Sequence, residues 1–181
     1  MRSAVNKMFL AGTGYDVEIE RAAARWGVPE SWILAVIEVE SAFNAGAYRY
    51  EAKLNDASYG LMQLLYSTAR GLGYTGSPEG LFDPAVNIDY GAKLLAQLRD
   101  RFGADFERVY SAYNSGRPDL YLTSDEVWNH VQRAMAALEH YAGQVIEAGG
   151  TVYEGTVNQP GAGAAVLIGL SALLFVSRKR R

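Results

Sequence analysis

Glu40 is the residue in this sequence best placed for acid chemistry. It follows the apolar run 32–37, and Pro29 just before that run fits the first turn of a helix. On a helix, Glu40 shares a face with Ile33 and Ile37, because residues three and four apart are neighbours. A carboxyl group among such neighbours is partly removed from water, which raises its pKa and favours the protonated acid. An acid that keeps its proton near neutral pH is what cleavage of a glycosidic bond requires.

Helical spacing alone leaves a second candidate, Glu38, which follows Leu34 and Ala35 by four and three residues. Most glutamates near a helix end are solvated and take no part in chemistry. The pattern therefore proposes two carboxyl groups and does not choose between them.

The composition of the 181 residues excludes several classes of site. There is no cysteine, so disulfides and thiolate metal sites are excluded, while the redox compartment stays open. The two histidines, His130 and His140, do not form the HExxH pattern of zinc hydrolases. The sequence therefore argues against a zinc hydrolase, and we expect no metal site.

The net charge of −3 is unevenly distributed. The last four residues, 178–181, are all basic, so residues 1–177 hold 13 basic against 20 acidic side chains, a net charge of −7. An acidic body of this kind is a poor partner for nucleic acid.

Apolar periodicity and helix-ending signals predict a body that is almost entirely helical. No alternating run is long enough for a convincing strand, and the Gly-, Asn- and Tyr-containing stretch 44–58 is predicted to be an irregular loop. Asp83 is expected to cap a helix, and Gly116 to end one in a left-handed conformation. The predicted fold class is all-α, with helices over 17–26, 87–102, 105–113 and 124–141, a further helix ending near Glu40, and helix-compatible residues up to Arg70.

The chain divides into segments of different composition. An N-terminal segment, 1–12, lacks the apolar core of a secretory signal, and the predicted helical domain covers 13–142. A Gly-rich linker follows over 143–160. The 17 residues 161–177 carry no charge, and the basic tail 178–181 stops them. This pattern predicts a single transmembrane helix with its tail on the cytoplasmic side and the folded body on the other.

Four motifs occur in order along the predicted body. They are Glu40-Ser41-x-Phe43-Asn44, Gly60-Leu61-Met62-Gln63-Leu64, Leu81-Phe82-Asp83-Pro84-x-x-Asn87-Ile88-x-x-Gly91 and Ala112-Tyr113-Asn114-Ser115-Gly116. Together, over residues 16–141, they resemble the soluble lytic transglycosylase (SLT, goose-lysozyme-like) domain family, which cleaves peptidoglycan. The resemblance implies a lysozyme-like helical domain. Two departures, Ala45 and Leu65-Tyr66 in place of a common Pro and Met-Pro, remove no chemical group.

The resemblance also implies roles for single residues. It makes Glu40 the catalytic acid, ahead of Glu38, and places Ser41 where the family orients that acid. Met62 and Gln63 match residues that line the sugar cleft. The remaining matches are Tyr113, at the position of a tyrosine hydrogen-bonded to the catalytic glutamate, and Asn114, which helps to shape the floor. For each supporting residue, plain packing is the alternative.

The family's chemistry needs one carboxyl group and no cofactor. The resemblance implies cleavage of the bond between N-acetylmuramic acid and N-acetylglucosamine, assisted by the substrate, with a 1,6-anhydromuramyl product. Asp56 and Glu51 remain possible partner acids for Glu40. The alternatives are a hydrolytic muramidase, which uses water, and a non-catalytic glycan-binding or structural membrane protein.

The predicted C-terminal anchor, without an N-terminal signal, is unusual for a resident enzyme of the cell envelope. It favours a protein carried in the virion membrane of a bacteriophage and used for local wall opening during entry, beside other phage membrane proteins. The alternative location is the bacterial inner membrane, with the domain facing the periplasm. The expected partners are peptidoglycan glycan strands and the membrane.

Overall fold

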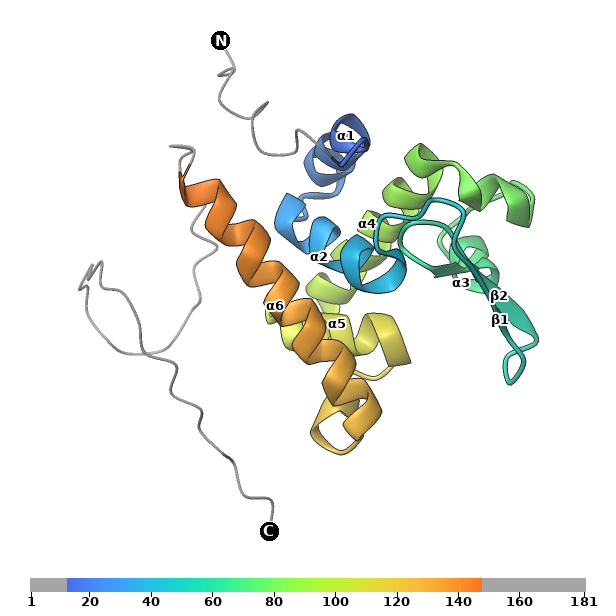
Figure 1. Cartoon of the computed structure of the whole chain (residues 1–181). Helices are drawn as coiled ribbons and strands as arrows, with labels where there is room; N and C mark the ends of the chain where they lie inside the picture. The colour runs from blue at the N-terminus through green and yellow to red at the C-terminus, as the bar shows by residue number, and fades with distance from the viewer. Residues whose placement is uncertain (1–12, 148–181) are drawn as a thin grey trace.

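The structure, a computed structural model, describes residues 13–147, which form six α-helices with a short sheet at one side (Figure 1). The helices are α1 (Asp16–Trp26), α2 (Glu30–Ser41), α3 (Tyr66–Gly71), α4 (Pro84–Phe102), α5 (Phe106–Ser115) and α6 (Asp125–Glu147). Two 3₁₀ turns, η2 (Pro78–Phe82) and η3 (Leu120–Leu122), precede α4 and α6. The strands are β1 (Tyr48–Glu51), β2 (Asp56–Tyr59) and β3 (Leu64–Leu65).

Helix α2 lies at the centre of the helical body. Its residues 32–37 are all buried, because α1, α4 and α6 pack around it. A helix that is apolar on every side is stable only when it is surrounded in this way. Figure 1 shows the long helix α6 running across α2, and the ring of Trp32 lies 5.0 Å from that of Phe106 on α5.

The predicted helices and their ends are largely confirmed. The side chain of Asp83 accepts hydrogen bonds from the backbone N–H groups of Ala85, at 2.8 Å, and Val86, at 3.4 Å, and so caps α4. Gly116 ends α5 with a left-handed φ of 75°. Helix α6 continues to Glu147, which lies beyond the predicted start of the linker at residue 143.

The all-α prediction, with an irregular loop over 44–58, was wrong in one respect. The strands β1, β2 and β3 form an antiparallel sheet in that order, with Tyr48 opposite Tyr59. Three of the four β1 residues are exposed, and both middle residues of β2 are buried. Strands this short and unevenly buried leave no alternating pattern in the sequence. The Tyr48 and Tyr59 rings, 5.4 Å apart, supply a cross-strand contact instead.

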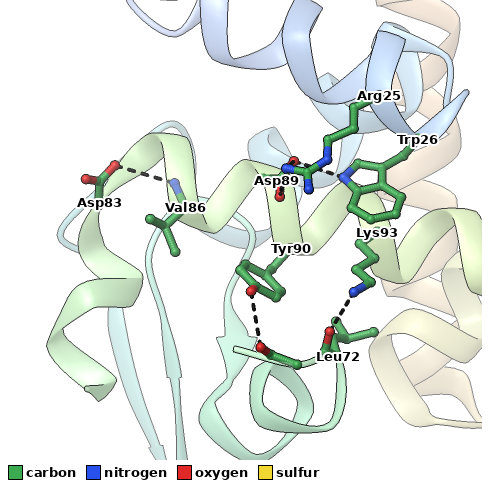
Figure 2. Close-up of polar contacts among 9 residues, drawn as sticks. Arg25, Trp26, Leu72, Asp83, Val86, Asp89, Tyr90 and Lys93 are labelled. Carbon is green, nitrogen blue, oxygen red and sulfur yellow. Dashed lines mark hydrogen bonds and ion pairs between the residues drawn. The ribbon is translucent and has the colours of Figure 1, made fainter. Parts of the chain in front are cut away.

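Polar contacts join α4 to its neighbours (Figure 2). The carboxylate of Asp89 accepts from the Arg25 guanidinium, at 3.0 Å, and from the Trp26 indole N–H, at 2.9 Å. On the next turn of α4, the Lys93 ammonium donates to the carbonyl of Leu72, at 2.6 Å. Through these contacts α4 holds both α1 and the segment after α3.

The predicted transmembrane helix 161–177 and the tail 178–181 lie outside the described residues. Within 13–147, none of the helices combines the length and the apolar character needed to cross a bilayer.

Candidate active site

Glu40 lies in the last turn of α2, where the apolar part of the helix meets the surface. Its side chain is half-buried, whereas Glu38 is exposed. Burial raises the pKa of Glu40 above its ordinary value, as the sequence predicted. After Ser41 the chain turns away from the helix through Ala42 and Phe43, whose φ angles of 50° and 62° are left-handed. The two glutamates that helical spacing left equal therefore lie in different environments.

A cavity of about 160 Å³ opens beside Glu40. Three of the predicted supporting residues line it together with this carboxyl group, although they come from segments far apart in the sequence: Gln63, Tyr113 and Asn114. The hairpin of β1 and β2 contributes Arg49, Glu51 and Leu54 to the same wall. An acid in a hollow of this kind has the arrangement expected of a catalytic carboxyl group.

The other two predicted residues, Ser41 and Met62, do not line this cavity. The hydroxyl of Ser41 donates to the carbonyl of Ile37 in the preceding helical turn, at 3.1 Å. Met62 is fully buried in the main core. Its carbonyl accepts a hydrogen bond from the Tyr113 hydroxyl, at 2.6 Å. In this structure Met62 therefore contributes through its backbone and its packing, and Ser41 bonds to its own helix.

The turn that carries Gln63 has an unusual backbone. Gly60 has a φ of 71°, and Gln63 itself has a left-handed φ of 44°. The side-chain amide of Gln63 donates to the carbonyls of Ala47, at 3.1 Å, and Gly60, at 3.0 Å. These bonds tie the turn to the start of β1. A Cβ at position 60 would come within 2.5 Å of the Leu81 carbonyl oxygen, so this position requires glycine.

Asn87, on α4, holds the turn from the other side. Its side-chain oxygen accepts from the backbone N–H of Met62, at 2.7 Å, and its amide donates to the carbonyls of Tyr59, at 2.8 Å, and Leu81, at 2.9 Å. Asn87 is fully buried. Sequence reasoning placed it at the start of a helix and assigned it no role, although its place in the third motif was a signal.

The hydroxyl group that contacts Glu40 belongs to Tyr110. It donates to Glu40 Oε1 at 2.7 Å, whereas the Tyr113 hydroxyl donates to Met62. The resemblance implied that Tyr113 would hold the glutamate, and this expectation is corrected. Both tyrosines lie on α5, three residues apart, so their rings stack 6.2 Å apart while their hydroxyl groups reach different partners. The three-residue spacing, which puts Tyr110 on the same face of the helix as Tyr113, was the sequence signal that could have identified Tyr110.

Charged side chains near Glu40 act on its pKa in opposite directions. Arg49 and Arg133 lower the pKa of Glu40, and Glu51 raises it, all by less than burial does. Arg49 and Glu51 form an ion pair with each other on β1. Across residues 13–147 there is no group of three or more His, Cys, Asp or Glu side chains arranged to hold a metal ion.

Comparison with known proteins identifies the family of the chain. The sequence model of the family described as "Transglycosylase SLT domain" matches residues 18–127, which include Glu40, Gln63 and Tyr113. The chain belongs to this family. Among curated relatives, "Membrane-bound lytic murein transglycosylase C" from two strains of Histophilus somni is 38% identical in an alignment 112 residues long, which covers 54% of this chain. The alignment spans 30% of those relatives' length.

Solved structures of SLT proteins share the fold. An inactive mutant of the lytic transglycosylase Slt from Pseudomonas aeruginosa superposes with a TM-score of 0.64 at 29% identity, covering 76% of this chain and 25% of that one. The 70 kDa soluble lytic transglycosylase from Escherichia coli gives a TM-score of 0.64 at 23% identity, over 81% of this chain and 26% of that one. The expected lysozyme-like SLT fold is therefore confirmed, with the short sheet as an addition.

Proposed function

We propose that the chain is a peptidoglycan lytic transglycosylase, a lyase that cleaves the β-1,4 bond between N-acetylmuramic acid and N-acetylglucosamine. The observation that carries this proposal is the half-buried carboxyl of Glu40 in the wall of a cavity, within a domain of the SLT family. Burial raises the pKa of Glu40, which favours the protonated acid. Gln63, Tyr113 and Asn114 support the proposal as candidate contacts to the sugar chain.

The proposed reaction proceeds in two proton transfers through one carboxyl group. Glu40 gives its proton to the bridging oxygen as the bond from this oxygen to the muramyl anomeric carbon breaks. The acetamido group of the muramyl residue supports the positive charge at that carbon. Ionised Glu40 then takes the proton from the muramyl 6-hydroxyl as its oxygen bonds to the anomeric carbon. The product is a 1,6-anhydro ring, no water is consumed, and Glu40 ends protonated.

The test uses the full chain and purified peptidoglycan. Glu40→Gln keeps the size of the side chain but has no acidic proton, so we expect loss of glycan cleavage with wall binding retained. Glu38→Gln is the matched control, because Glu38 lies two residues away and is exposed. We expect the Glu38→Gln variant to cleave glycan strands as the parent does. Full activity of Glu40→Gln would reject the catalytic assignment.

A hydrolytic muramidase is the second candidate, and the position of Glu51 favours it. This side chain is 25% exposed and lines the same cavity as Glu40, although Arg49 pairs with it. A second carboxylate that activates water would give a reducing end. Mass spectrometry of the products separates the two reactions, since anhydro ends lack the mass of one water. For the transglycosylase we expect anhydro ends, and activity of Glu51→Gln within about threefold of the parent, since this route needs no second carboxylate. Reducing ends, together with loss of activity in Glu51→Gln, would establish the muramidase.

The proposal extends to the setting of the enzyme. Segment 161–177 would anchor the domain in a membrane, with the domain facing the wall. The apolar sequence followed by four basic residues supports this placement, as does the word "membrane-bound" in the name of the Histophilus relatives. Resistance of the full chain to alkaline extraction from membranes would test it. The role in phage entry stays a prediction, tested by mass spectrometry of purified virions.

A further inference from the structure

Tyr110 occupies a rigid place in the core beside the proposed catalytic acid. Its side chain is fully buried. Its ring stacks between Phe106, at 5.9 Å and 22°, and Tyr113, at 6.2 Å and 8°. Phe106 in turn contacts Trp32 of α2. A ring fixed on both faces in a close-packed core has one accessible orientation, so the position of its hydroxyl group is set by the fold.

The hydroxyl of Tyr110 is directed at one oxygen of Glu40. The O–H group donates to Oε1 at 2.7 Å, a length typical of a strong hydrogen bond. Within the described part of the chain, this is the only hydrogen bond made to the Glu40 carboxyl group. Burial, followed by the neighbouring Glu40 charge, raises the pKa of Tyr110, so the hydroxyl keeps its proton and stays a donor.

We propose that Tyr110 is a positioning residue for Glu40, holding Oε1 so that Oε2 carries the proton presented to the glycosidic oxygen. This inference rests on the proposed function of Glu40. A free carboxyl group rotates and exposes either oxygen, whereas a carboxyl held at one oxygen presents the other in a fixed direction. Such orientation matters because a small misplacement of a reacting group costs a large part of the rate.

The same hydrogen bond serves the second half of the reaction. After Glu40 has given up its proton, it is a carboxylate that must persist until the 6-hydroxyl attacks. Burial alone would destabilise this charged form. A donated O–H stabilises it, so Tyr110 lowers the pKa of Glu40 and opposes the larger effect of burial. Tyr110 therefore helps one carboxyl group to act first as an acid and then as a base.

Other charged groups also shift the pKa of Glu40, and their contributions must be distinguished from that of Tyr110. From β1, Arg49 lowers and Glu51 raises the pKa of Glu40, and Arg133 of α6 lowers it. His130 of α6 contacts Arg133. Burial is the first cause that lowers the pKa of His130, so this ring is uncharged above neutral pH. The carbon-13 titration of glutamate-labelled protein, described below, separates the ionisation of Glu40 from that of His130.

The test is Tyr110→Phe in the full chain, because phenylalanine keeps the stacked ring and removes only the hydroxyl. Loss of the donor destabilises the Glu40 carboxylate, so its pKa rises and the active protonated form persists to higher pH. We expect the alkaline limb of kcat/KM to move up by about one pH unit. We expect kcat to fall about tenfold with KM unchanged, since Tyr110 is buried and does not touch the glycan.

Two control variants separate position from packing. Tyr113→Phe removes the neighbouring hydroxyl, which bonds to Met62, and should leave the alkaline limb in place. Tyr74 belongs to a separate core cluster, and its hydroxyl donates to the carbonyl of Ser77. Tyr74→Phe should therefore leave both kcat and the alkaline limb of kcat/KM unchanged. An alkaline limb and kcat of Tyr110→Phe equal to those of the parent would overturn the positioning role.

A measurement without turnover keeps this inference distinct from the proposed function. Carbon-13 NMR of glutamate-labelled protein, with Glu40→Gln to identify the signal, follows the ionisation of Glu40 directly. We expect it to titrate at higher pH in Tyr110→Phe than in the parent. An unshifted titration refutes the role of Tyr110 even if Glu40 is catalytic. A shifted titration in a protein that cleaves no peptidoglycan supports the Tyr110 contact and refutes the enzymatic proposal.

Discussion

Replacement of Asn87 by leucine tests how the turn beside the cavity is held in place. Leucine is similar in size to asparagine but makes none of the three hydrogen bonds that reach Met62, Tyr59 and Leu81. Each lost bond is worth about 1 kcal/mol, and a buried donor or acceptor left without a partner costs about 1–3 kcal/mol. The bonds to Met62 and Leu81 are buried and that to Tyr59 is partly so. Counting the two buried groups as unpaired and the third as a lost bond gives a loss of about 3–7 kcal/mol. This is a large part of the stability of an ordinary domain.

The assay is urea unfolding followed by circular dichroism, with glycan cleavage measured under conditions where the variant is still folded. We expect the midpoint to fall without a change in slope, because the same surface is exposed on unfolding. Cleavage should also fall, since the Met62 backbone and Gln63 belong to the turn that Asn87 holds. Asn129→Leu, at an exposed position of α6, is the control and should change stability by about 0.5 kcal/mol or less. A loss below about 1 kcal/mol for Asn87→Leu would show that these hydrogen bonds do not hold the turn.

Two further substitutions probe the packing around α4, and the same unfolding assay measures both. Gly91→Ala places a Cβ 2.2 Å from the Met62 sulfur, so we expect a loss of about 1–3 kcal/mol; a gain in stability, as for alanine in an ordinary helix, would contradict this contact. Asp89→Ala removes the acceptor of both Arg25 and the Trp26 indole, and we expect a loss of about 1–2 kcal/mol; Asp100→Ala, whose partner Arg99 is adjacent in sequence, is the control and should have little effect.

Much of the helical framework was predictable because its signals are local. The cap at Asp83, the left-handed exit at Gly116 and the apolar run before Glu40 depend on residues within one or two turns. The same local information missed the hairpin of β1 and β2. Its stability comes from pairing between strands and from ring contacts such as Tyr48 with Tyr59, neither of which has a periodic signature in four residues.

The site residues that belong to the four ordered motifs could be predicted from the sequence. Glu40, Gln63, Tyr113 and Asn114 do gather around one cavity, although no spacing within a single segment implies this. The sequence could not show which tyrosine donates a hydrogen bond to Glu40. Whether Tyr110 or Tyr113 reaches Glu40 depends on how α5 is rotated against α2, and this rotation follows from packing in three dimensions.

Helix α5 explains why the carboxyl group and the turn beside it keep one relative position. Tyr110 holds Glu40 at 2.7 Å, and Tyr113, one turn later, holds the carbonyl of Met62 at 2.6 Å. The N–H of Met62 is in turn held by Asn87 of α4, and α4 packs against α5. The N–H and the carbonyl of Met62 are therefore held by α4 and α5, and α5 also holds the acid. Removal of either the Tyr110 or the Tyr113 hydroxyl would release only one of these two contacts, so the acid and the turn can be tested separately.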